Sequence, residues 1–124
     1  TPFWRQTMEE NAQDTAVYVS SAAQEEIVAS GNDVLDLLAN SEHYQSQKLL
    51  LDQAHLAPAF FDLSSGLAGE IFLKLTNYRV KTAVVADLAA IPSERFHELV
   101  YECNKGRQIN FFTDFAAAEA WLAK

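Results

Sequence analysis

A Ser-Ser-Gly turn ahead of an amphipathic segment is the stretch of this sequence best suited to chemistry. Residues 60–71 are FFDLSSGLAGEI, in which Ser64 and Ser65 precede a run with helical periodicity. A serine at a helix start accepts a hydrogen bond from a first-turn N–H, and the same N–H groups and the helix dipole stabilise a phosphate. Gly66 has no side chain, so a ligand or another backbone can approach it closely. The turn predicts a plain helix cap or, alternatively, an anion or phosphorylation site.

Three aspartates in and after this turn offer a second possibility, which is catalysis by clustered carboxylates. Asp62 stands in the turn, and Asp87 and Asp114 follow the strands predicted next along the chain. All three are expected near the carboxyl edge of the sheet, where open α/β sheets bind ligands. A cleft that holds two of them with Ser64 would favour a small enzyme, whereas a flat or filled surface would favour a binding module. The nucleophile elbow Gly-x-Ser-x-Gly is absent, and none of the three histidines has a recognisable catalytic spacing.

One face of the segment after the turn is polar. Glu70, Lys74 and Asn77 are spaced i, i+4 and i+7, so a helix places them on one side, opposite its apolar stripe. An ion pair from Glu70 to Lys74 has the favourable orientation and contributes about 0.3–0.5 kcal/mol. Helix stability alone explains the stripe, or the stripe marks an interaction surface.

Two short cationic segments, NYRVK (77–81) and NKGRQ (104–108), each join a predicted helix end to the start of a predicted strand. In a parallel sheet both fall on the edge formed by the strand amino ends, opposite the serine turn. Cations near helix carboxyl ends complement the helix dipole, which is one explanation. The other is a patch for a small anion, an acidic partner surface or a second copy of the chain. The residues of this predicted patch are Asn77, Arg79, Lys81, Asn104, Lys105 and Arg107.

Metal and thiol chemistry have little support in the sequence. Glu94 and His97 have the i, i+3 spacing of helical di-iron sites, but the sequence holds no second copy of the pair. The single cysteine, Cys103, excludes an internal disulfide and is expected on an apolar helix face as an inert thiol. No P-loop, dinucleotide fingerprint or zinc spacing is present. We therefore predict no catalytic residue, no metal site and no cofactor.

Length, composition and charge indicate the class of protein. A chain of 124 residues, 49% hydrophobic and 21% charged, suits one globular domain over residues 1–124. The formal net charge of −8 disfavours nucleic acid and anionic membranes as partners. No apolar run approaches about 20 residues, and the amino end lacks the pattern of a signal peptide. We expect a protein of the cytoplasm.

Alternating apolar and amphipathic segments predict the elements that position these residues. Strand-type residues at 3–8 and 15–20 flank a polar connection, which predicts a hairpin. Three strand–helix units follow, which favours parallel strands with right-handed crossovers. The expected fold is α/β, with a mixed sheet of about five strands: an N-terminal antiparallel hairpin, then parallel strands with helical crossovers. Strands are expected at 48–53, 81–87 and 108–113, with a further option at 25–30, and helices at 32–40, 64–78, 93–106 and 114–124.

Local signals predict the ends and faces of these helices. Asn32 or Asp33 is expected to cap the first helix, and Ser93 the third. Gly106 suits a left-handed residue at the end of the third helix. Apolar spacing predicts inward stripes that include Tyr78 on the second helix and Phe115 on the last.

Three segments carry a resemblance to a known family. They are FFDLSSGLAGEI (60–71), NYRVKTAVVAD (77–87) and YECNKGR (101–107), with a looser match at DVLDLLAN (33–40). On these residues the chain resembles the bacterial domain-of-unknown-function family 4180, whose pattern has a basic residue in place of Ser64. That family has no established catalytic residues, so the resemblance implies a fold and no reaction.

A looser similarity, in the order strand, turn, helix and strand, is to the STAS fold of anti-sigma-factor antagonists. In those proteins a serine in an Asp-Ser-Ser/Thr-Gly-Leu turn is phosphorylated by a partner kinase. In this chain DLSSGL places Leu63 between Asp62 and Ser64. The similarity therefore implies a STAS-like architecture rather than the phosphorylation switch.

These observations favour a regulatory or binding module without catalysis, which acts through a protein partner or a small anionic ligand. The alternative is a small enzyme with a carboxylate or serine site at the carboxyl edge of the sheet. A homodimer whose contact uses Trp4 or Trp121 is a third option.

Overall fold

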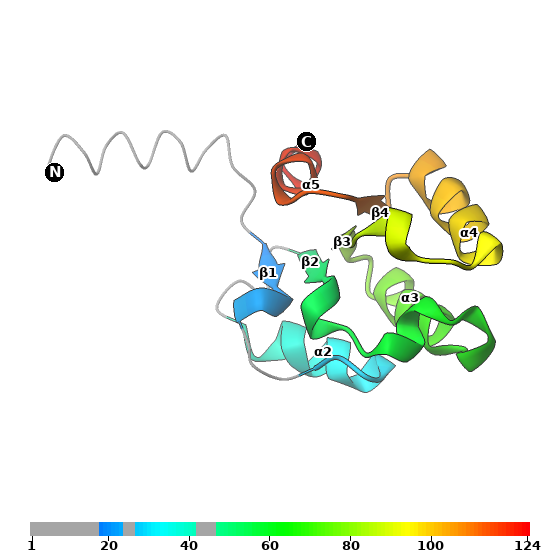
Figure 1. Cartoon of the computed structure of the whole chain (residues 1–124). Helices are drawn as coiled ribbons and strands as arrows, with labels where there is room; N and C mark the ends of the chain where they lie inside the picture. Colours follow the sequence, from blue (N-terminus) through cyan, green and yellow to red (C-terminus); the bar gives the residue numbers. More distant parts are fainter. Residues whose placement is uncertain (1–17, 24–26, 42–46) are drawn as a thin grey trace, which may run out of the picture.

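A four-stranded parallel sheet forms the middle layer of the fold (Figure 1). The computed structural model describes residues 18–23, 27–41 and 47–124. Neighbouring strands within these ranges all run parallel and follow one another across the sheet in chain order. They are β1 (Val19–Ser20), β2 (Lys48–Asp52), β3 (Lys81–Val85) and β4 (Ile109–Phe112).

The four α-helices of the described residues cover the two faces of this sheet. Three of them, α2 (Gly31–Ala39), α3 (Leu67–Asn77) and α4 (Glu94–Lys105), connect successive strands and pack on one face. The last, α5 (Phe115–Leu122), packs on the other face, and Figure 1 shows it across the strands from α2 and α3. Because the strand order never reverses, crossovers of one hand bring all three connecting helices to the same face.

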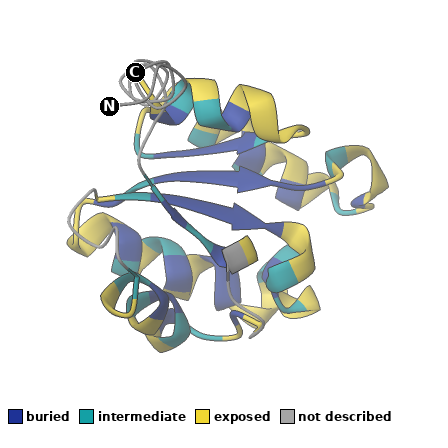
Figure 2. Cartoon of the chain, turned by 90° about the vertical axis from the view of Figure 1, so that its left-hand side faces the viewer, coloured by how far each residue is buried: buried dark blue, intermediate teal, exposed yellow. Residues whose placement is uncertain are grey.

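Alternating side chains of the strands build a core on each face. Leu49 and Leu51 of β2 pack with α2, α3 and α4, while Leu50 between them packs with Ala118 and Leu122 of α5. This alternation is the period of two that a strand imposes on its side chains. In Figure 2 the buried strands form a continuous layer between the helices. The larger core lies on the face that three helices cover.

Four phenylalanines tie the segment after β2 to the larger core. Phe60, in the 3₁₀ turn η4 (Pro58–Phe61), is fully buried. Its ring meets those of Phe72 and Phe96 edge-on, at centroid distances of 5.7 and 6.1 Å. Phe111 of β4 contacts the same two rings. Edge-to-face pairs contribute about 0.5–1.5 kcal/mol each beyond area burial, so the cluster holds this segment against α3 and α4.

A parallel sheet has two chemically different edges at its strand ends. At the carboxyl edge, β2 and β3 end at Asp52 and Val85, and the 3₁₀ turns and helix starts follow. At the amino edge, β2 and β3 begin at Lys48 and Lys81, and the helices that precede them, α2 and α3, end at Ala39 and Asn77. Each edge therefore collects residues that are far apart in the sequence.

The predicted antiparallel hairpin and fifth strand are not found among the described residues. Residues 3–8 lie outside them, and the described part of 15–20 contributes β1, which pairs parallel with β2. The described part of the predicted strand at 25–30 forms a single parallel bridge from Val28 to Leu56. The described sheet is parallel rather than mixed because the chain returns from β1 to β2 through helix α2 and not through a tight turn.

The other predicted strands and helices are confirmed within a few residues, but two predicted helix ends are wrong. Ser93 caps α4 as predicted, since its hydroxyl accepts a hydrogen bond from a first-turn N–H. At α2 the cap is Ser30 rather than Asn32 or Asp33, because Ser30 is extended and its hydroxyl accepts from the Asp33 N–H. Gly106 has a φ of −96°, so the end of α4 needs no left-handed residue.

Two aromatic residues predicted to face inward are exposed. Tyr78 is 58% exposed because α3 ends at Asn77 and the apolar stripe ends with it. Phe115 is 47% exposed because it is the first residue of α5, at the carboxyl edge, and the helix packs through Ala118 and Leu122 instead.

Candidate functional site

The Ser-Ser-Gly turn is a self-contained hydrogen-bonded structure at the carboxyl edge. Its serines lie in the 3₁₀ turn η5 (Leu63–Ser65), and α3 begins only at Leu67. The Asp62 carboxylate accepts from the Ser64 N–H at 3.0 Å and from the Ser64 hydroxyl at 2.6 Å. The Ser65 hydroxyl lies 2.7 Å from the Asp62 carbonyl oxygen and accepts from the Leu67 N–H at 3.2 Å. Both serines therefore stabilise the turn and the entry to α3.

Gly66 is required by backbone conformation and not by a close approach. Its φ is 78°, in the left-handed region, and it caps the 3₁₀ turn. A Cβ built at this position would meet no atom within 4 Å. Glycine is favoured here because other residues are strained at positive φ.

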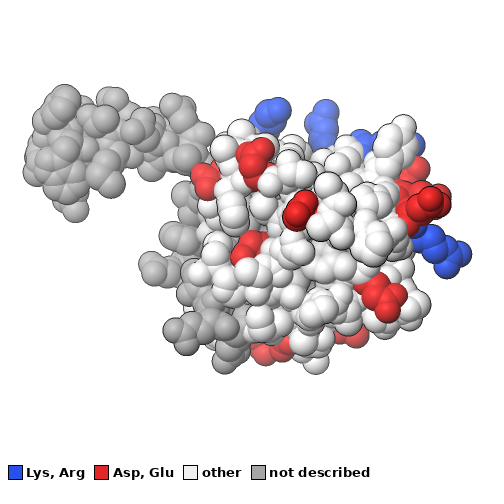
Figure 3. Space-filling view, viewed as in Figure 1, with Lys and Arg blue, Asp and Glu red and all other residues white. Residues whose placement is uncertain are grey.

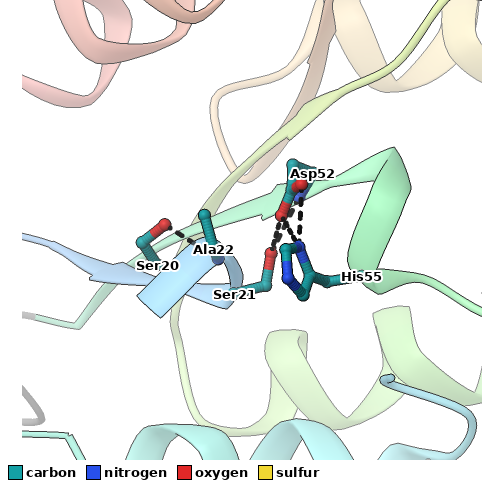
Figure 4. A network of polar contacts seen from close by, with 5 residues as sticks. All are labelled: Ser20, Ser21, Ala22, Asp52 and His55. Atoms are coloured by element: carbon teal, nitrogen blue, oxygen red, sulfur yellow. Dashed lines mark hydrogen bonds and ion pairs between the residues drawn. The ribbon is translucent and has the colours of Figure 1, made fainter. Parts of the chain in front are cut away.

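A buried carboxylate at the end of β2 forms a second network, which no sequence motif indicated. Asp52 accepts from the Ser21 hydroxyl at 2.5 Å, and Nδ1 of His55 lies 2.9 Å from each of its carboxylate oxygens (Figure 4). The Asp52 N–H donates to the Ser21 hydroxyl oxygen at 2.9 Å. Ser21 and Asp52 are 1% and 7% exposed, so these bonds join the ends of β1 and β2 away from water.

The order of the three groups decides their chemistry. In a serine–histidine–carboxylate triad the histidine stands between the other two and takes the serine proton. In this network Asp52 stands between Ser21 and His55, so the hydroxyl proton points to the carboxylate. The Nε2 atom of His55 makes no hydrogen bond to any described residue. An imidazole oriented in this way by a carboxylate has the arrangement of a general acid or base.

Two hollows open at the carboxyl edge, and Gln53 lines both. The larger, about 500 Å³, has mainly apolar walls from the loops after β2 and β3, with Gln53, Asp62 and Ser93 as polar groups. The smaller, about 300 Å³, lies over the ends of β2, β3 and β4, and its lining includes Asp52 and Asp87. The Gln53 side-chain oxygen accepts from the Asp87 N–H at 2.8 Å, which fixes this side chain between the two hollows.

The three carboxylates predicted at this edge do not meet in either hollow. Asp62 lines the larger one and Asp87 the smaller one. Asp114 caps α5 by accepting from the Ala117 N–H at 2.7 Å. Ser64 lines neither hollow. An enzyme site was expected to combine two of these carboxylates with Ser64, and neither hollow does so.

Glu70 joins two helices. Its carboxylate accepts from the N–H of Gly31, the first residue of α2, where the helix dipole favours negative charge. Within the described ranges Glu70 forms no ion pair with Lys74. Gly31 is buried under both side chains, and a Cβ there would lie 2.9 Å from Cγ of Lys74. Glu70 thus anchors α3 to α2, while Asn77 at the end of α3 is exposed.

Several residues of the predicted amino-edge patch have local roles instead. The Asn104 side chain bonds the N–H and the carbonyl oxygen of Phe111 at 2.7 and 3.4 Å, which covers the outer edge of β4. Lys105 pairs with Glu102 at 3.2 Å. Arg79 is exposed and has a φ of 55° in the turn before β3.

Lys81 and Arg107 belong to a different cluster, the cationic corner, which consists of Lys48, Lys81, Arg107 and Lys124. Lys48 and Lys81 are register partners at the starts of β2 and β3. Burial lowers the pKa of Lys81, and repulsion from the other three cations lowers it further. Nζ of Lys81 donates to main-chain oxygens of Trp121 at 2.8 Å and Lys124 at 3.2 Å. The structure thus brings two of the predicted cations together with two others.

Trp121, predicted as a possible dimer contact, covers the smaller core. Its ring centroid lies 5.6 Å from that of Phe112, and the Lys81 ammonium lies 4.5 Å from the same ring centroid. Trp4 lies outside the described residues.

The surface at the carboxyl edge carries few charged side chains, and most of those are acidic. Figure 3 views the molecule with this edge toward the reader, and Asp and Glu are scattered over the face, while Lys and Arg lie mainly at its rim. This edge therefore presents scattered negative charge, whereas the cationic corner gathers positive charge at the amino edge.

Metal-binding groups are not gathered in the part of the chain that the structure describes. No set of three or more His, Cys, Asp or Glu side chains is placed there to hold an ion. His97 Nε2 lies 2.7 Å from the Ile91 carbonyl oxygen. Burial raises the pKa of the half-buried Cys103 thiol, and the Glu102 charge raises it further, which disfavours the reactive thiolate. No helix in the described ranges has the length and apolar character needed to span a bilayer.

The Asp52 network had a partial signal in the sequence. In LLLDQAH (49–55) an aspartate ends a buried strand and a histidine follows three residues later. That spacing places both at the carboxyl edge, where polar groups of a parallel sheet gather. Ser21 had no such signal, because it is 31 residues away and lies beyond a segment predicted as half of a hairpin.

The fold and its edges define a small parallel α/β domain with an acidic carboxyl edge and a cationic corner at the amino edge. The family model described as "Domain of unknown function (DUF4180)" matches residues 12–122, and the chain belongs to this family. The resemblance expected from segments such as 60–71 is thereby confirmed. No curated protein and no solved structure matches the chain.

Proposed function

We propose that the chain is a regulatory or binding module that acts through a protein partner or a small ligand, without turnover of a substrate. The bonding of the hydroxyls at the carboxyl edge carries this proposal. Ser21, Ser64 and Ser65 are each bonded to a carboxylate or carbonyl oxygen, and none of them is bonded to a described histidine. A serine without an adjacent base is a weak nucleophile.

The larger hollow supports a small ligand as one kind of partner. Its volume of about 500 Å³ and its mainly apolar walls are typical of small-molecule sites, which orient the ligand by a few polar groups. Asp62, Gln53 and Ser93 are the polar groups available here. A ligand with an apolar body and a hydrogen-bond donor fits this lining best.

A STAS-like architecture in the cytoplasm is part of the proposal. The succession of β2, the serine turn, α3 and β3 supports the likeness, and the parallel pairing of β1 with β2 departs from the hairpin expected with it. Likeness of fold associates the chain with regulation but assigns no activity. The acidic composition and single cysteine support the compartment.

Proton NMR of a metabolite mixture tests binding against turnover. We expect the purified chain to broaden the resonances of selected metabolites while their concentrations stay constant over many hours. A metabolite that disappears only when the chain is present would contradict the proposal.

A small enzyme remains the second candidate, and one observation favours it. His55 is held by Asp52 through Nδ1, and its Nε2 makes no bond to a described residue. If the metabolite experiment shows turnover, His55→Gln should abolish it, because the amide cannot accept and return a proton. Turnover that persists in His55→Gln would exclude this residue as the acid–base group.

A further inference from the structure

The cationic corner gathers positive charge on a chain with 17 acidic and 9 basic residues. Lys48 and Lys81 start neighbouring strands and are register partners, so their backbones are about 4.8 Å apart. The Thr82 N–H donates to the Gln108 carbonyl oxygen at 2.8 Å, which places Arg107 beside the start of β3. Three strand starts thus contribute one cation each to a single row.

Lys81 connects this row to the end of α5. Its ammonium donates to the main-chain oxygens of Trp121 and Lys124, at 2.8 and 3.2 Å. These two main-chain oxygens orient the ammonium toward the end of α5. The Lys124 side chain is the fourth cation of the corner, and it acts on Lys81 by charge repulsion.

The two exposed cations of the corner are not neutralised by carboxylates of the described residues. Both ion pairs found there lie elsewhere, so Arg107 and Lys124 have no acidic partner within the described ranges. The repulsion that helps to lower the pKa of Lys81 comes from the other members of the corner. A partner that brings negative charge would relieve this repulsion.

The geometry of the corner suits a row of carboxylates better than a single phosphate. Proteins hold phosphate with main-chain N–H groups at helix amino ends, and α2, α3 and α4 end at this edge instead of beginning there. The cations spread over three strand starts, roughly 10 Å across by the usual strand spacing. Side chains on one face of an extended segment recur about every 6.6 Å, so two carboxylates can face the row.

We propose that the cationic corner docks an acidic segment of a partner protein. This inference rests on the proposed binding function, and it names the chemistry of the partner. Nucleic acid carries about one charge per 1.7 Å as a DNA duplex, or per 3.4 Å of one strand, over a length much greater than the corner, and the acidic remainder of the chain repels it. A short acidic segment confines its charge to the corner.

Fluorescence anisotropy with a fluorescein-labelled octaglutamate peptide tests the proposal. The double variant Arg107→Glu/Lys124→Glu reverses two exposed charges of the corner and leaves Lys81 in place. We expect it to bind at least about tenfold more weakly than the wild type at low salt, because complementary charge drives the encounter. Raising the ionic strength from about 0.05 to about 0.5 M should weaken wild-type binding and shrink this difference.

Arg95→Glu is the matched control for charge. Arg95 is exposed in the first turn of α4, at the opposite edge, and the substitution makes the same change of charge per residue. We expect its affinity for octaglutamate to stay within about twofold of the wild type, because distant exposed charges are screened.

Four results would overturn the proposal. They are no binding of octaglutamate by the wild type, equal binding by the double variant, an equal loss in Arg95→Glu, or tighter binding of a labelled oligothymidylate at the same corner. Light scattering that shows a wild-type dimer and a monomeric double variant would assign the corner to a second copy of the chain and would overturn it as well. Each of these results leaves the metabolite experiment to decide the broader binding function.

Discussion

Charged side chains have different roles at the two edges of the sheet. At the carboxyl edge, Asp52, Asp62 and Asp114 each accept hydrogen bonds from neighbouring groups of the chain. At the amino edge, Arg107 and Lys124 have no acidic partner within the described ranges. Charge at the first edge therefore stabilises local structure, whereas charge at the second is available to a partner.

This difference follows from the polarity of a parallel sheet. Strands end where turns and helices begin, and the first turn of a helix leaves N–H groups that acidic and hydroxyl side chains satisfy. Helices end at the opposite edge, where the dipole favours cations. Local needs thus explain the acidic residues one by one, but they do not explain why four cations stand together.

Asp52→Ala should give the largest loss of stability. It leaves the buried Ser21 hydroxyl without its acceptor and releases His55, so we expect the free energy of unfolding to fall by about 2–3 kcal/mol. Asp87→Ala is the control, since this exposed carboxylate follows the next strand, which ends at Val85, and makes no bond to a described residue. It should change the free energy of unfolding by less than about 0.5 kcal/mol. Urea unfolding followed by tryptophan fluorescence measures both, and equal losses would contradict a structural role for Asp52.

Asp62→Ala should have the next largest effect at the same edge. The carboxylate accepts from the N–H and hydroxyl of Ser64, so its loss should lower the free energy of unfolding by about 1 kcal/mol. Asp62→Asn keeps an acceptor and should recover most of this loss. If Asp62→Ala leaves stability unchanged, the carboxylate is not needed by the turn and becomes a candidate for ligand binding.

Lys81→Met tests the charge repulsion at the amino edge through the pH dependence of the free energy of unfolding. Burial and neighbouring cations lower the pKa of Lys81 below 10.5, so between its folded pKa and 10.5 the unfolded chain binds more protons. The free energy of unfolding therefore rises with pH through that window. Below the window, the charged Lys81 lowers the free energy of unfolding by a constant amount. Urea titrations from about pH 8 to 10.5 should show this rise in the wild type relative to Lys81→Met. Parallel curves for the two proteins would show that neither burial nor the neighbouring cations lower the pKa of Lys81.

Arg107→Ala and Lys124→Ala should have the smallest effects on stability. Both side chains are exposed and have no described acidic partner, so each change should stay within about 0.5 kcal/mol in urea unfolding. Slight stabilisation is expected at low salt because the corner then contains less repulsion. A loss above about 1 kcal/mol would mean that these charges serve the fold, and the contrast between the edges would fail.

Much of the fold was predictable because its signals are local. The aliphatic runs of β2 and β3 and the amphipathic period of α4 lie within single segments, and Ser93 caps α4 directly beside them. The parallel pairing of β1 was not predictable in this way. It depends on where β2 lies in space, and a two-residue strand has too few side chains to show a period.

The serine turn and the cationic corner were likewise predictable only where their signals are local. The serine turn was found from its composition, but its η5 geometry, with α3 starting at Leu67, depends on the bonds from Asp62 and on the left-handed Gly66. The cationic corner was found in part, through the cations that precede β3 and β4. Lys48 and Lys124 joined it only through strand register and the packing of α5.

Nitrogen-15 NMR of the labelled chain during titration with octaglutamate tests the contrast between the edges most directly. We predict chemical-shift changes in the backbone amides around Lys81, Arg107 and Lys124, with those of Asp62 and Ser64 unchanged. Shifts centred on the carboxyl edge, or none at the cationic corner, would contradict the account.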